Sequence, residues 1–557
     1  MPRRIGRRKF ITTSSLAVAG AALGGSAFAQ MRGGGGMGGG GGGMGGGGGG
    51  MGGGTTIVDP PVSGPLLALP VARGEPMSDP MLGSFTQYTI RARVASVAVA
   101  GMSASSLVYE DALSPFHGRF VAPVIRVSRG ERVRLKFENR LPKKSATNIL
   151  GHPKYPTNVH VHGLHVSPGA DAKSCLPADD VHKVVNPGGG TLTFDYDLSK
   201  QRNGSLALYH PHLHGSVAEQ MWSGLVGAID VLDKTVASTF PTDLLTLKDV
   251  TISNGAPAPY TMMSEYMHGK EGQILTVNGQ VNPYIEAEAG EVRRLRILNV
   301  SNARFYRVAL QGHSLHVIGT DGGLLSAPSV AQSEILMAPG ERVDVLVQVA
   351  TTNGDYKLLA LPYARMGNMA TPQITLMTVR VRGTGTTPRA LPVAIDGEAA
   401  PRLGDDSSLP RPRFALSMGM GRGYINGVSF EVLADGSISA TERHSMVGDD
   451  EIWEVVNDSG MDHPWHQHVN DAQLLTLSGG DAAVAKYAAL YTSVAAWKDT
   501  IIIPKWGSAT FRIPVRDFGG MTMFHCHILE HEDIGMMGMW HLMPMSAGGC
   551  AMPPMQK

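Results

Sequence analysis

The chain has 557 residues, which is enough for several domains rather than one. Hydrophobic residues make up 43% and charged residues 17%, a balance that excludes a largely disordered protein. With 48 Lys and Arg against 47 Asp and Glu, the net charge is only +1. This balance argues against a dominant role in binding nucleic acid or an anionic membrane surface.

Residues 1–29 have the pattern of an export signal. Paired arginines precede Lys9-Phe10-Ile11, an apolar run follows, and Ala27-Phe28-Ala29 fits the small-x-small pattern that a signal peptidase cuts. The arginine pair favours twin-arginine (Tat) export, and an ordinary Sec signal is the alternative. The apolar run is too short to span a membrane. We therefore expect an exported protein, periplasmic or extracellular, without a membrane span.

Glycine and methionine dominate residues 30–60, where Met37, Met44 and Met51 recur every seven residues. Such a tract cannot bury enough apolar surface to fold, so we predict a flexible tail. Low-complexity sequence without a ligand role is the favoured interpretation. Copper scavenging is the alternative, because thioethers are soft ligands suited to Cu(I).

The rest of the chain is predicted to consist of strands, because short alternating runs are separated by Gly, Pro and Asn turns. An internal repeat is also visible. Segments at 130, 290 and 449 (GERVRLKFENRL, GEVRRLRILNVSN and DDEIWEVVNDSG) match in pattern, and each precedes a second predicted strand. Three copies of one unit predict an all-β chain of three tandem β-sandwiches, and we place these domains at 80–235, 240–390 and 410–548.

Histidines gather on the first and third repeats as four His-x-His pairs. Because residues i and i+2 of a strand face the same way, each pair offers two imidazoles on one face. Eight imidazoles exceed the needs of one zinc or copper ion. The sequence therefore predicts a cluster of several metal ions between these repeats. The pairs are His160 and His162, His210 and His212, His466 and His468, and His525 and His527.

Cys526 lies between the two histidines of the last pair. In an extended segment its side chain faces away from theirs, so the thiolate can bind a different metal ion. His463, His531 and Met536 supply the remaining ligands nearby. Two histidines, a thiolate and a weak methionine ligand are typical of a blue-copper electron-transfer site. Cys526 would then join this site to the cluster through very few covalent bonds.

At these residues the chain resembles the multicopper oxidase family, and HPHLHG and HCHILEHEDIGMM are similar to the motifs of bacterial laccases and copper-efflux cuprous oxidases. The resemblance covers roughly residues 85 to 545. It implies three tandem cupredoxin-like Greek-key domains with four copper ions: one type 1, one type 2 and two type 3. It further implies an enzyme that takes single electrons from a small reducing substrate and reduces dioxygen to water. We expect a monomer.

The resemblance also implies a role for each ligand residue. These are His463, Cys526, His531 and Met536 for the type 1 copper; His160 and His466 for the type 2 copper; His162, His210 and His527 for one type 3 copper; and His212, His468 and His525 for the other.

Oxygen reduction consumes protons, so acids are expected beside the cluster. The family carboxylate that follows the third-domain histidine corresponds to Glu532. The other acid falls in an apparent insertion, GADAKSCLPADD. Counting forward from the histidines favours Asp171, whereas counting back from the following NPG turn favours Asp179. We favour Asp179 and keep Asp171 as the alternative.

The substrate is harder to predict. Cuprous oxidases of the family carry a long Met- and His-rich insert over the type 1 copper, whereas the corresponding stretch here has only Met418 and Met420. We therefore expect phenols or aromatic amines. Cu(I) is the alternative, because Met262, Met263 and Met267 add further thioethers. Some exported three-cupredoxin proteins have lost copper and act as scaffolds, but the complete ligand set argues against that role.

Four residues near these motifs receive no ligand role. His165 and His214 have the wrong register or lie in the next turn, so we expect them to be structural. Cys175 and Cys550 remain. Export permits a disulfide between them, although pairing cannot be read from the sequence.

Overall fold

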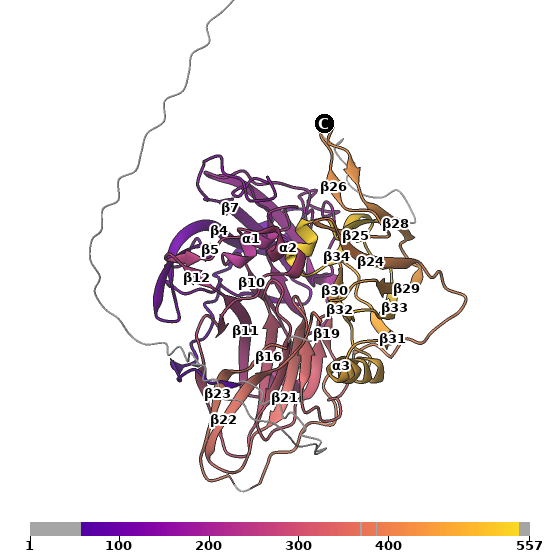
Figure 1. Ribbon diagram of the computed structural model, residues 1–557. Helices are drawn as coiled ribbons and strands as arrows, with labels where there is room; N and C mark the ends of the chain where they lie inside the picture. Colours follow the sequence, from indigo (N-terminus) through magenta and orange to yellow (C-terminus); the bar gives the residue numbers. More distant parts are fainter. Residues whose placement is uncertain (1–56, 368–369, 386, 545–557) are drawn as a thin grey trace, which may run out of the picture. The chain divides into compact units, whose positions relative to one another are not determined.

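The computed structural model describes residues 57–367, 370–385 and 387–544. The export signal, the Gly/Met tail up to residue 56 and Cys550 lie outside these residues. Strands dominate and the few helices are short, in agreement with the predicted all-β class (Figure 1). In the part of the chain that is described, no helix has the length and apolar character needed to cross a lipid bilayer.

The first third of the chain builds two sheets around one core. One sheet has the order β3-β4-β7-β8, with β5 paired to β4, and the other has the order β6-β10-β9. Ile90 and Phe137 from the first sheet pack in one buried cluster with Ile125 and Ile229 from the second. The elements are β3 (Glu75–Asp79), β4 (Gly83–Val99), β5 (Met102–Asp111), β6 (Ile125–Ser128), β7 (Arg132–Asn139), β8 (Gly190–Asp197), η1 (Leu198–Lys200), β9 (Leu206–Tyr209), α1 (Val217–Trp222) and β10 (Gly227–Leu232).

The middle third also builds two sheets, with the orders β14-β11-β16-β21-β18-β19 and β2-β15-β23-β22-β17-β20. The elements are η2 (Val236–Thr239), β11 (Thr242–Val250), β12 (Ile252–Ser253), β13 (Ala256–Pro257), α2 (Met263–His268), β14 (Ile274–Val277), β15 (Pro283–Glu288), β16 (Val292–Asn299), β17 (Tyr306–Leu310), β18 (His316–Thr320), β19 (Gly323–Leu324), β20 (Ile335–Met337), β21 (Arg342–Gln348), β22 (Gly354–Leu361) and β23 (Gln373–Arg382).

Two strands of the second sheet come from the N-terminal part of the chain. β1 (Ile57–Val58) runs parallel to β23, and β2 (Gly64–Pro65) runs parallel to β15. Ile57 and Val58, which lie within the predicted flexible tail, thus form β1. Strand β3 pairs with β4 and lies before residue 80, the predicted start of the first domain.

The final third has two five-stranded sheets, β25-β24-β29-β33-β31 and β28-β35-β34-β30-β32, and a small β26-β27 ribbon. The elements are β24 (Arg413–Gly419), β25 (Arg422–Ile425), β26 (Glu431–Val432), β27 (Ile438–Ser439), β28 (Thr441–Met446), β29 (Asp450–Asn457), β30 (His463–Gln467), β31 (Gln473–Ser478), α3 (Ala482–Ser493), β32 (Thr500–Ile503), β33 (Ser508–Pro514), β34 (Gly520–Cys526), α4 (Leu529–Asp533) and β35 (Met537–Met543).

The internal repeat of the sequence is a repeat of strand pairing. The two strands predicted in each copy pair antiparallel: β7 with β8, β16 with β21, and β29 with β33. The first strand of each copy also pairs parallel with a strand from earlier in the chain, which is β4, β11 or β24. The same three-stranded unit thus occurs three times.

Each first strand of the repeat ends in a buried asparagine: Asn139, Asn299 and Asn457. In every copy the side-chain amide donates to two main-chain carbonyls, and its oxygen accepts the N–H group two residues further on. An asparagine can make such bonds on both sides of its amide group. The repeated asparagine therefore ties the end of the strand to the chain that returns beside it.

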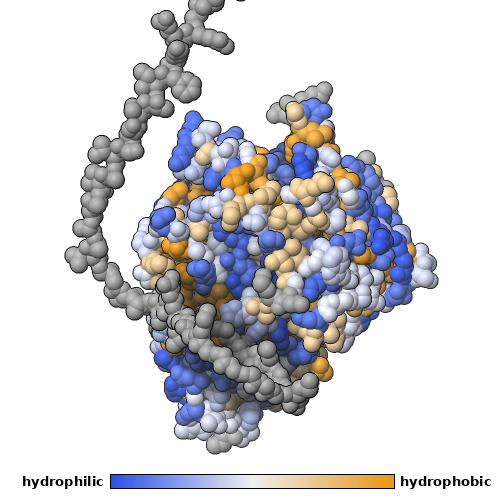
Figure 2. Space-filling model, in the orientation of Figure 1, coloured by the Kyte–Doolittle hydropathy of each residue, from blue (hydrophilic) through white to orange (hydrophobic). Residues whose placement is uncertain are grey.

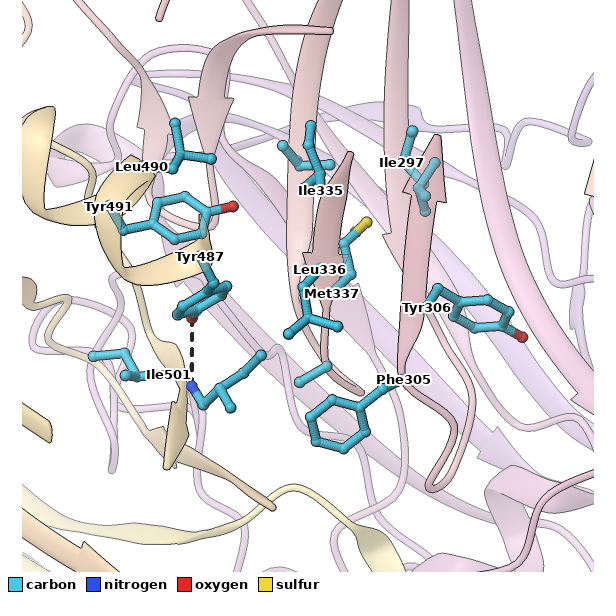
Figure 3. Close-up of a cluster of buried hydrophobic side chains, with 14 of the residues drawn as sticks. Ile297, Phe305, Tyr306, Ile335, Leu336, Met337, Tyr487, Leu490, Tyr491 and Ile501 are labelled. Carbon is cyan, nitrogen blue, oxygen red and sulfur yellow. Dashed lines mark hydrogen bonds between the residues drawn. The ribbon is translucent and has the colours of Figure 1, made fainter. Parts of the chain in front are cut away.

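Helix α3, in the final third, packs against the middle third. The Asp481 side chain caps its N-terminus by accepting from Ala483 N and Val484 N. Figure 3 shows Tyr487, Leu490 and Tyr491 on α3 facing the strand that carries Ile335, and these side chains belong to one buried cluster. The Tyr487 hydroxyl also donates to the buried Glu341 carboxylate over 2.6 Å.

We predict that Asn299→Ala lowers the free energy of unfolding by about 3 kcal/mol, because two buried carbonyls and one N–H group lose their partner. Denaturant unfolding of wild type and variant would measure the shift. The matched control is Asn353→Ala, at an exposed position, where we expect a change within about 0.5 kcal/mol. Equal shifts for the two variants would contradict the role given to the buried asparagine.

Candidate metal centres

Strand pairing brings the His-x-His motifs together within each half of the site. In the first third, His160 and His210 bridge each other through two main-chain hydrogen bonds of 2.8 and 3.1 Å. In the final third, β30 pairs with β34 so that His466 lies opposite His525. All eight histidine side chains of the four motifs are buried.

The two halves then meet ring against ring. His160 stacks on His468 with ring centroids 3.9 Å apart, and His162 stacks on His466 at 3.7 Å with the rings nearly parallel. Imidazoles from the first repeat therefore stack on imidazoles from the third repeat within one buried space.

Several subsets of these imidazoles have the spacing of a metal site. The Nε2 atom of His525 lies 3.2 Å from that of His212 and 3.2 Å from that of His468. Other groups whose ligand atoms lie within 4.8 Å of one another are His160, His162 and His210, and His160, His466 and His468. Imidazole is a ligand suited to copper.

The orientation of the rings supports metal binding. His160 Nδ1 lies 2.9 Å from the Asp179 carboxylate, His210 Nδ1 donates to the Pro211 carbonyl, and His466 Nδ1 donates to the Asp499 carbonyl over 2.8 Å. A proton held on Nδ1 leaves the Nε2 lone pair facing inward. Within the described residues, the Nε2 atoms of these three histidines have no hydrogen-bond partner. A buried nitrogen without a partner is costly, so these side chains fit copper ions in this space.

His162 is turned the other way. Its Nε2 atom lies 3.2 Å from Asp499 Oδ1 and 2.9 Å from an Arg342 nitrogen. Its Nδ1 atom is buried, and no protein partner for it occurs among the described residues. His162 would therefore offer Nδ1 to a metal ion, in contrast to its stacked neighbour His466.

Cys526 forms a second group on the other side of its strand. Its sulfur lies 3.4 Å from His463 Nδ1 and 3.5 Å from His531 Nδ1, and these two nitrogens are 3.1 Å apart. His463 Nε2 donates to Ser459 Oγ over 2.8 Å, which leaves Nδ1 free to bind a metal ion. Burial raises the pKa of the Cys526 thiol, so a bound cation would have to displace its proton.

Met536 lies beside this group. Its N–H group donates to the His531 carbonyl over 2.8 Å, and its own carbonyl accepts from Cys526 N–H over 3.1 Å. The side chain is completely buried. A Cβ at Gly423 would come within 2.7 Å of Met536 Cβ, so glycine is required at that position for the close approach.

Two of the three candidate acids contact the histidines. Glu532 is fully buried, and its oxygens lie 3.3 Å from His525 Nδ1 and 3.5 Å from His212 Nδ1. Asp179 bonds His160, as described above. Asp171 instead pairs with Arg132 over 2.8 Å and accepts N–H bonds within its own turn. The geometry favours Asp179, because the inserted turn shifts the count from the histidines.

Sequence reasoning missed Asp499 and Arg342. Arg342 is completely buried and holds both oxygens of Asp499 at 2.6 and 2.7 Å. Desolvation raises the pKa of the Asp499 carboxyl, but the charge and hydrogen bonds of Arg342, together with His466 and Thr500, outweigh it and bring that pKa to about 2. The available signal was a charged residue in the second predicted strand of the middle repeat, which is β21, because buried strands seldom carry unpaired charge.

The residues that received no ligand role have other partners. His165 Nε2 lies 2.9 Å from Asp517 Oδ2, and its Nδ1 donates to the Val469 carbonyl. The His214 ring packs against His152 and Phe430. Cys175 takes part in a disulfide, and its predicted partner lies outside the described residues.

Comparison with known proteins agrees with the copper chemistry of these side chains. Matches to multicopper oxidase domains cover residues 102–236, 235–382 and 425–545. The chain belongs to the multicopper oxidase family. Its three β-sandwich units are accordingly cupredoxin-like domains, and the protein is a copper-dependent oxidoreductase with oxygen as the electron acceptor.

The relatives of this multicopper oxidase have different names. It is 28% identical to a laccase of Bacillus subtilis, over 76% of this chain and 88% of that one. It is 26% identical to the cell division protein FtsP of Xenorhabdus nematophila, over 76% and 82% of the two chains. A solved structure, a multicopper oxidase from Campylobacter jejuni described as a metallo-oxidase, is 25% identical with a TM-score of 0.70, over 88% and 98%. Family membership alone therefore does not determine which substrate this protein oxidises.

The His165–Asp517 pair links the first and third domains and predicts a pH dependence. The hydrogen bond from His165 is the main cause that lowers the pKa of Asp517 to about 2, from 3.8. A lowered carboxyl pKa stabilises the folded state above pH 3.8, and this contribution is lost as the pH falls towards 2. Asp517→Asn should therefore lower the thermal midpoint at pH 6, and the difference from wild type should shrink towards pH 3.

Thermal unfolding followed from pH 6 to pH 3 would measure this difference. The control is Asp458→Asn, at an exposed carboxylate, for which we expect no such trend. A constant difference for Asp517→Asn across this range would contradict the assignment.

Proposed function

We propose that this protein is an exported, laccase-like oxidase that uses four copper ions to pass electrons from phenols or aromatic amines to dioxygen, which is reduced to water. The observation that carries the proposal is the position of Cys526. Its sulfur lies with His463 and His531, while its chain neighbours His525 and His527 point to the buried imidazole cluster.

This geometry and the family membership support the proposed ligand set. Copper supplies the one-electron redox chemistry when it is bound. The proposed ligands are His463, Cys526, His531 and Met536 for type 1; His160 and His466 for type 2; His162, His210 and His527 for the first type 3; and His212, His468 and His525 for the second.

The chain provides the route between the two centres. Cys526 pairs with Trp465 in the sheet, and His525 pairs with His466, so all four residues are fixed by the β30–β34 ladder. The covalent path from the Cys526 sulfur to a cluster imidazole runs through the Cys526 side chain, a short piece of main chain and the side chain of His525 or His527. The rigid ladder keeps this path short and constant in length.

The positions of two carboxyl groups support a role in proton transfer. Glu532 lies within 3.5 Å of His212 and His525, and Asp179 lies against His160. Reduction of dioxygen to water takes up four electrons with four protons, so groups that hold a proton beside the cluster are required. We assign Glu532 and Asp179 to this role, whereas Asp171 stabilises its own turn.

Cys526→Ser tests the proposal. The variant should lose the intense blue absorption of a copper–thiolate bond and its oxygen uptake with a phenol, while it keeps most of its copper, because the cluster histidines remain. Met536→Leu is the control: it keeps the thiolate and should keep the blue band. A copper-loaded wild type without a blue band and without oxygen uptake would overturn the proposed function.

Oxidation of Cu(I) is the second candidate, supported by methionines near α4, which carries His531. A Cβ at Gly421 would come within 3.3 Å of Met263 Cε, so α2 touches the β24–β25 turn. Met262 and Met420 are 60% and 101% exposed at this place. Met267 and Met418 pack in the same cluster as Leu529 and Ile534, at the two ends of α4. Exposed thioethers can bind Cu(I).

The double variant Met263→Leu/Met420→Leu separates the two candidates. If Cu(I) is a substrate, its KM should rise on the order of tenfold in the variant, because leucine keeps the volume but removes the soft ligand. The kinetics with a phenol should stay unchanged. Met81→Leu, at a site 84% exposed, is the control. An unchanged KM for Cu(I) would remove the methionines from the substrate site.

A further inference from the structure

One face of the third-domain sheet carries a triad of metal-ligand side chains outside the site described above. His444 on β28 lies opposite His541 on β35, and their rings stack 4.4 Å apart at an angle of 7°. Glu442 lies two residues before His444 and therefore on the same face. One of its oxygens is 3.4 Å from His444 Nε2 and 3.7 Å from His541 Nε2. Two imidazole nitrogens thus converge on one carboxylate oxygen.

Methionines extend this triad across the sheet. Met521 on β34 lies opposite His541, and Met523 lies opposite Met539, which in turn lies opposite Glu442. The other face of β35 carries Trp540 and Leu542, which belong to the domain core. The thioethers therefore share their face with the two histidines and not with the core.

These methionines form a row that extends from the surface of the domain towards the buried imidazole cluster. β28 forms the edge of the sheet, on the right-hand side of Figure 1. Met446 and Met543, which pair next to the triad, are each 44% exposed, whereas Met523 is 2% exposed. The next residue on the same face of β34 after Met523 is His525, one of the proposed type 3 ligands.

Four methionines of the row pack together. Met521, Met523, Met537 and Met539 contact the same small cluster, which is closed by Val181 from the first domain and by Phe430. Phe430 precedes the β26–β27 ribbon, which exposes the apolar side chains of Val432 and Leu433. Figure 2 shows hydrophobic surface on this projection. Neighbouring strands lie about 4.8 Å apart, and residues i and i+2 about 6.7 Å apart, so consecutive thioethers are one short step from each other.

We propose that Glu442, His444 and His541 form a docking site for Cu(I), and that the methionine row formed by Met521, Met523, Met537 and Met539 passes the ion to the buried cluster. Two imidazoles and the adjacent Met521 thioether are soft or borderline ligands, and Glu442 supplies the compensating negative charge. The ion stays Cu(I) along the row, so the transfer requires no electron. The destination of the ion rests on the proposed function, but the docking site does not.

The state of the imidazoles agrees with this role. Burial lowers the pKa of His541, and the neighbouring His444 lowers it further. A lowered pKa favours metal binding at His541, since a ligating nitrogen must give up its proton. Leucine or isoleucine would fill the same core volume without offering sulfur, so the concentration of methionines is not required for packing.

The docking site is tested first by binding. Apo protein is titrated anaerobically with Cu(I) in competition with a colorimetric Cu(I) chelator, and the double variant His444→Ala/His541→Ala is compared with wild type. We expect the variant to bind one ion fewer per chain. The control His313→Ala/His316→Ala removes two histidines from the second domain and should bind as wild type does. Equal stoichiometry in all three proteins would overturn the docking site.

The row is tested by the rate of copper loading. Met521→Leu/Met539→Leu keeps the packing volume but removes two thioethers. After one limiting addition of Cu(I), the ion should become inaccessible to the chelator more slowly than in wild type, on the order of tenfold, with the same final copper content. Met77→Leu, on an exposed strand of the first domain, is the control. Equal loading rates would overturn the row as a path.

The outcomes also separate this inference from the proposed function. A wild type that binds the surface ion but never becomes a blue oxidase would refute the proposed function and leave the docking site standing. If the protein is a blue oxidase and copper loads at the same rate in every variant, the methionine row is refuted as a path and the proposed function remains intact.

Discussion

The rest of the structure depends on burying eight imidazoles in one space where each nitrogen still finds a partner. An unsatisfied buried nitrogen costs free energy, so each ring nitrogen that finds a fixed protein partner lowers the cost of burying the eight rings. The fold solves half of the problem by giving one nitrogen of several rings to fixed acceptors, such as Asp179, the Pro211 carbonyl and the Asp499 carbonyl. The other nitrogens face one another and are left for metal ions.

The middle domain takes part in this solution although it carries no His-x-His pair. Arg342 reaches from β21 to hold both oxygens of Asp499, whose side chain and carbonyl fix His162 and His466. A bidentate pair of this kind is strong and directional, and its full burial makes the loss of either partner costly. Gly163 permits the approach, since a Cβ there would lie 2.2 Å from an Arg342 nitrogen. The middle domain therefore helps to enclose and orient the buried histidine cluster.

Features that depend on near neighbours could be predicted from the sequence. Strand alternation, the three repeats and the His-x-His pairs all follow from residue spacing, and in the fold the repeated strands pair in the same way three times. Features that depend on distant segments could not. The choice between Asp171 and Asp179 turned on the path of an inserted loop, and the Arg342–Asp499 pair joins residues 157 positions apart. No local pattern marks such a meeting.

The position of β1 and β2 has a consequence for the order in which the protein can fold. These strands are made first, yet β1 pairs with β23, more than 300 residues later in the chain. Contacts of such long range form slowly, because the intervening chain must be closed into a loop first. The edge of the middle-domain sheet at β15 stays open until β2 covers it, and an open edge invites pairing with other chains. The residues of β1 and β2 thus become anchored only when the middle domain is complete, so their protection from proteases would report the folding of that domain.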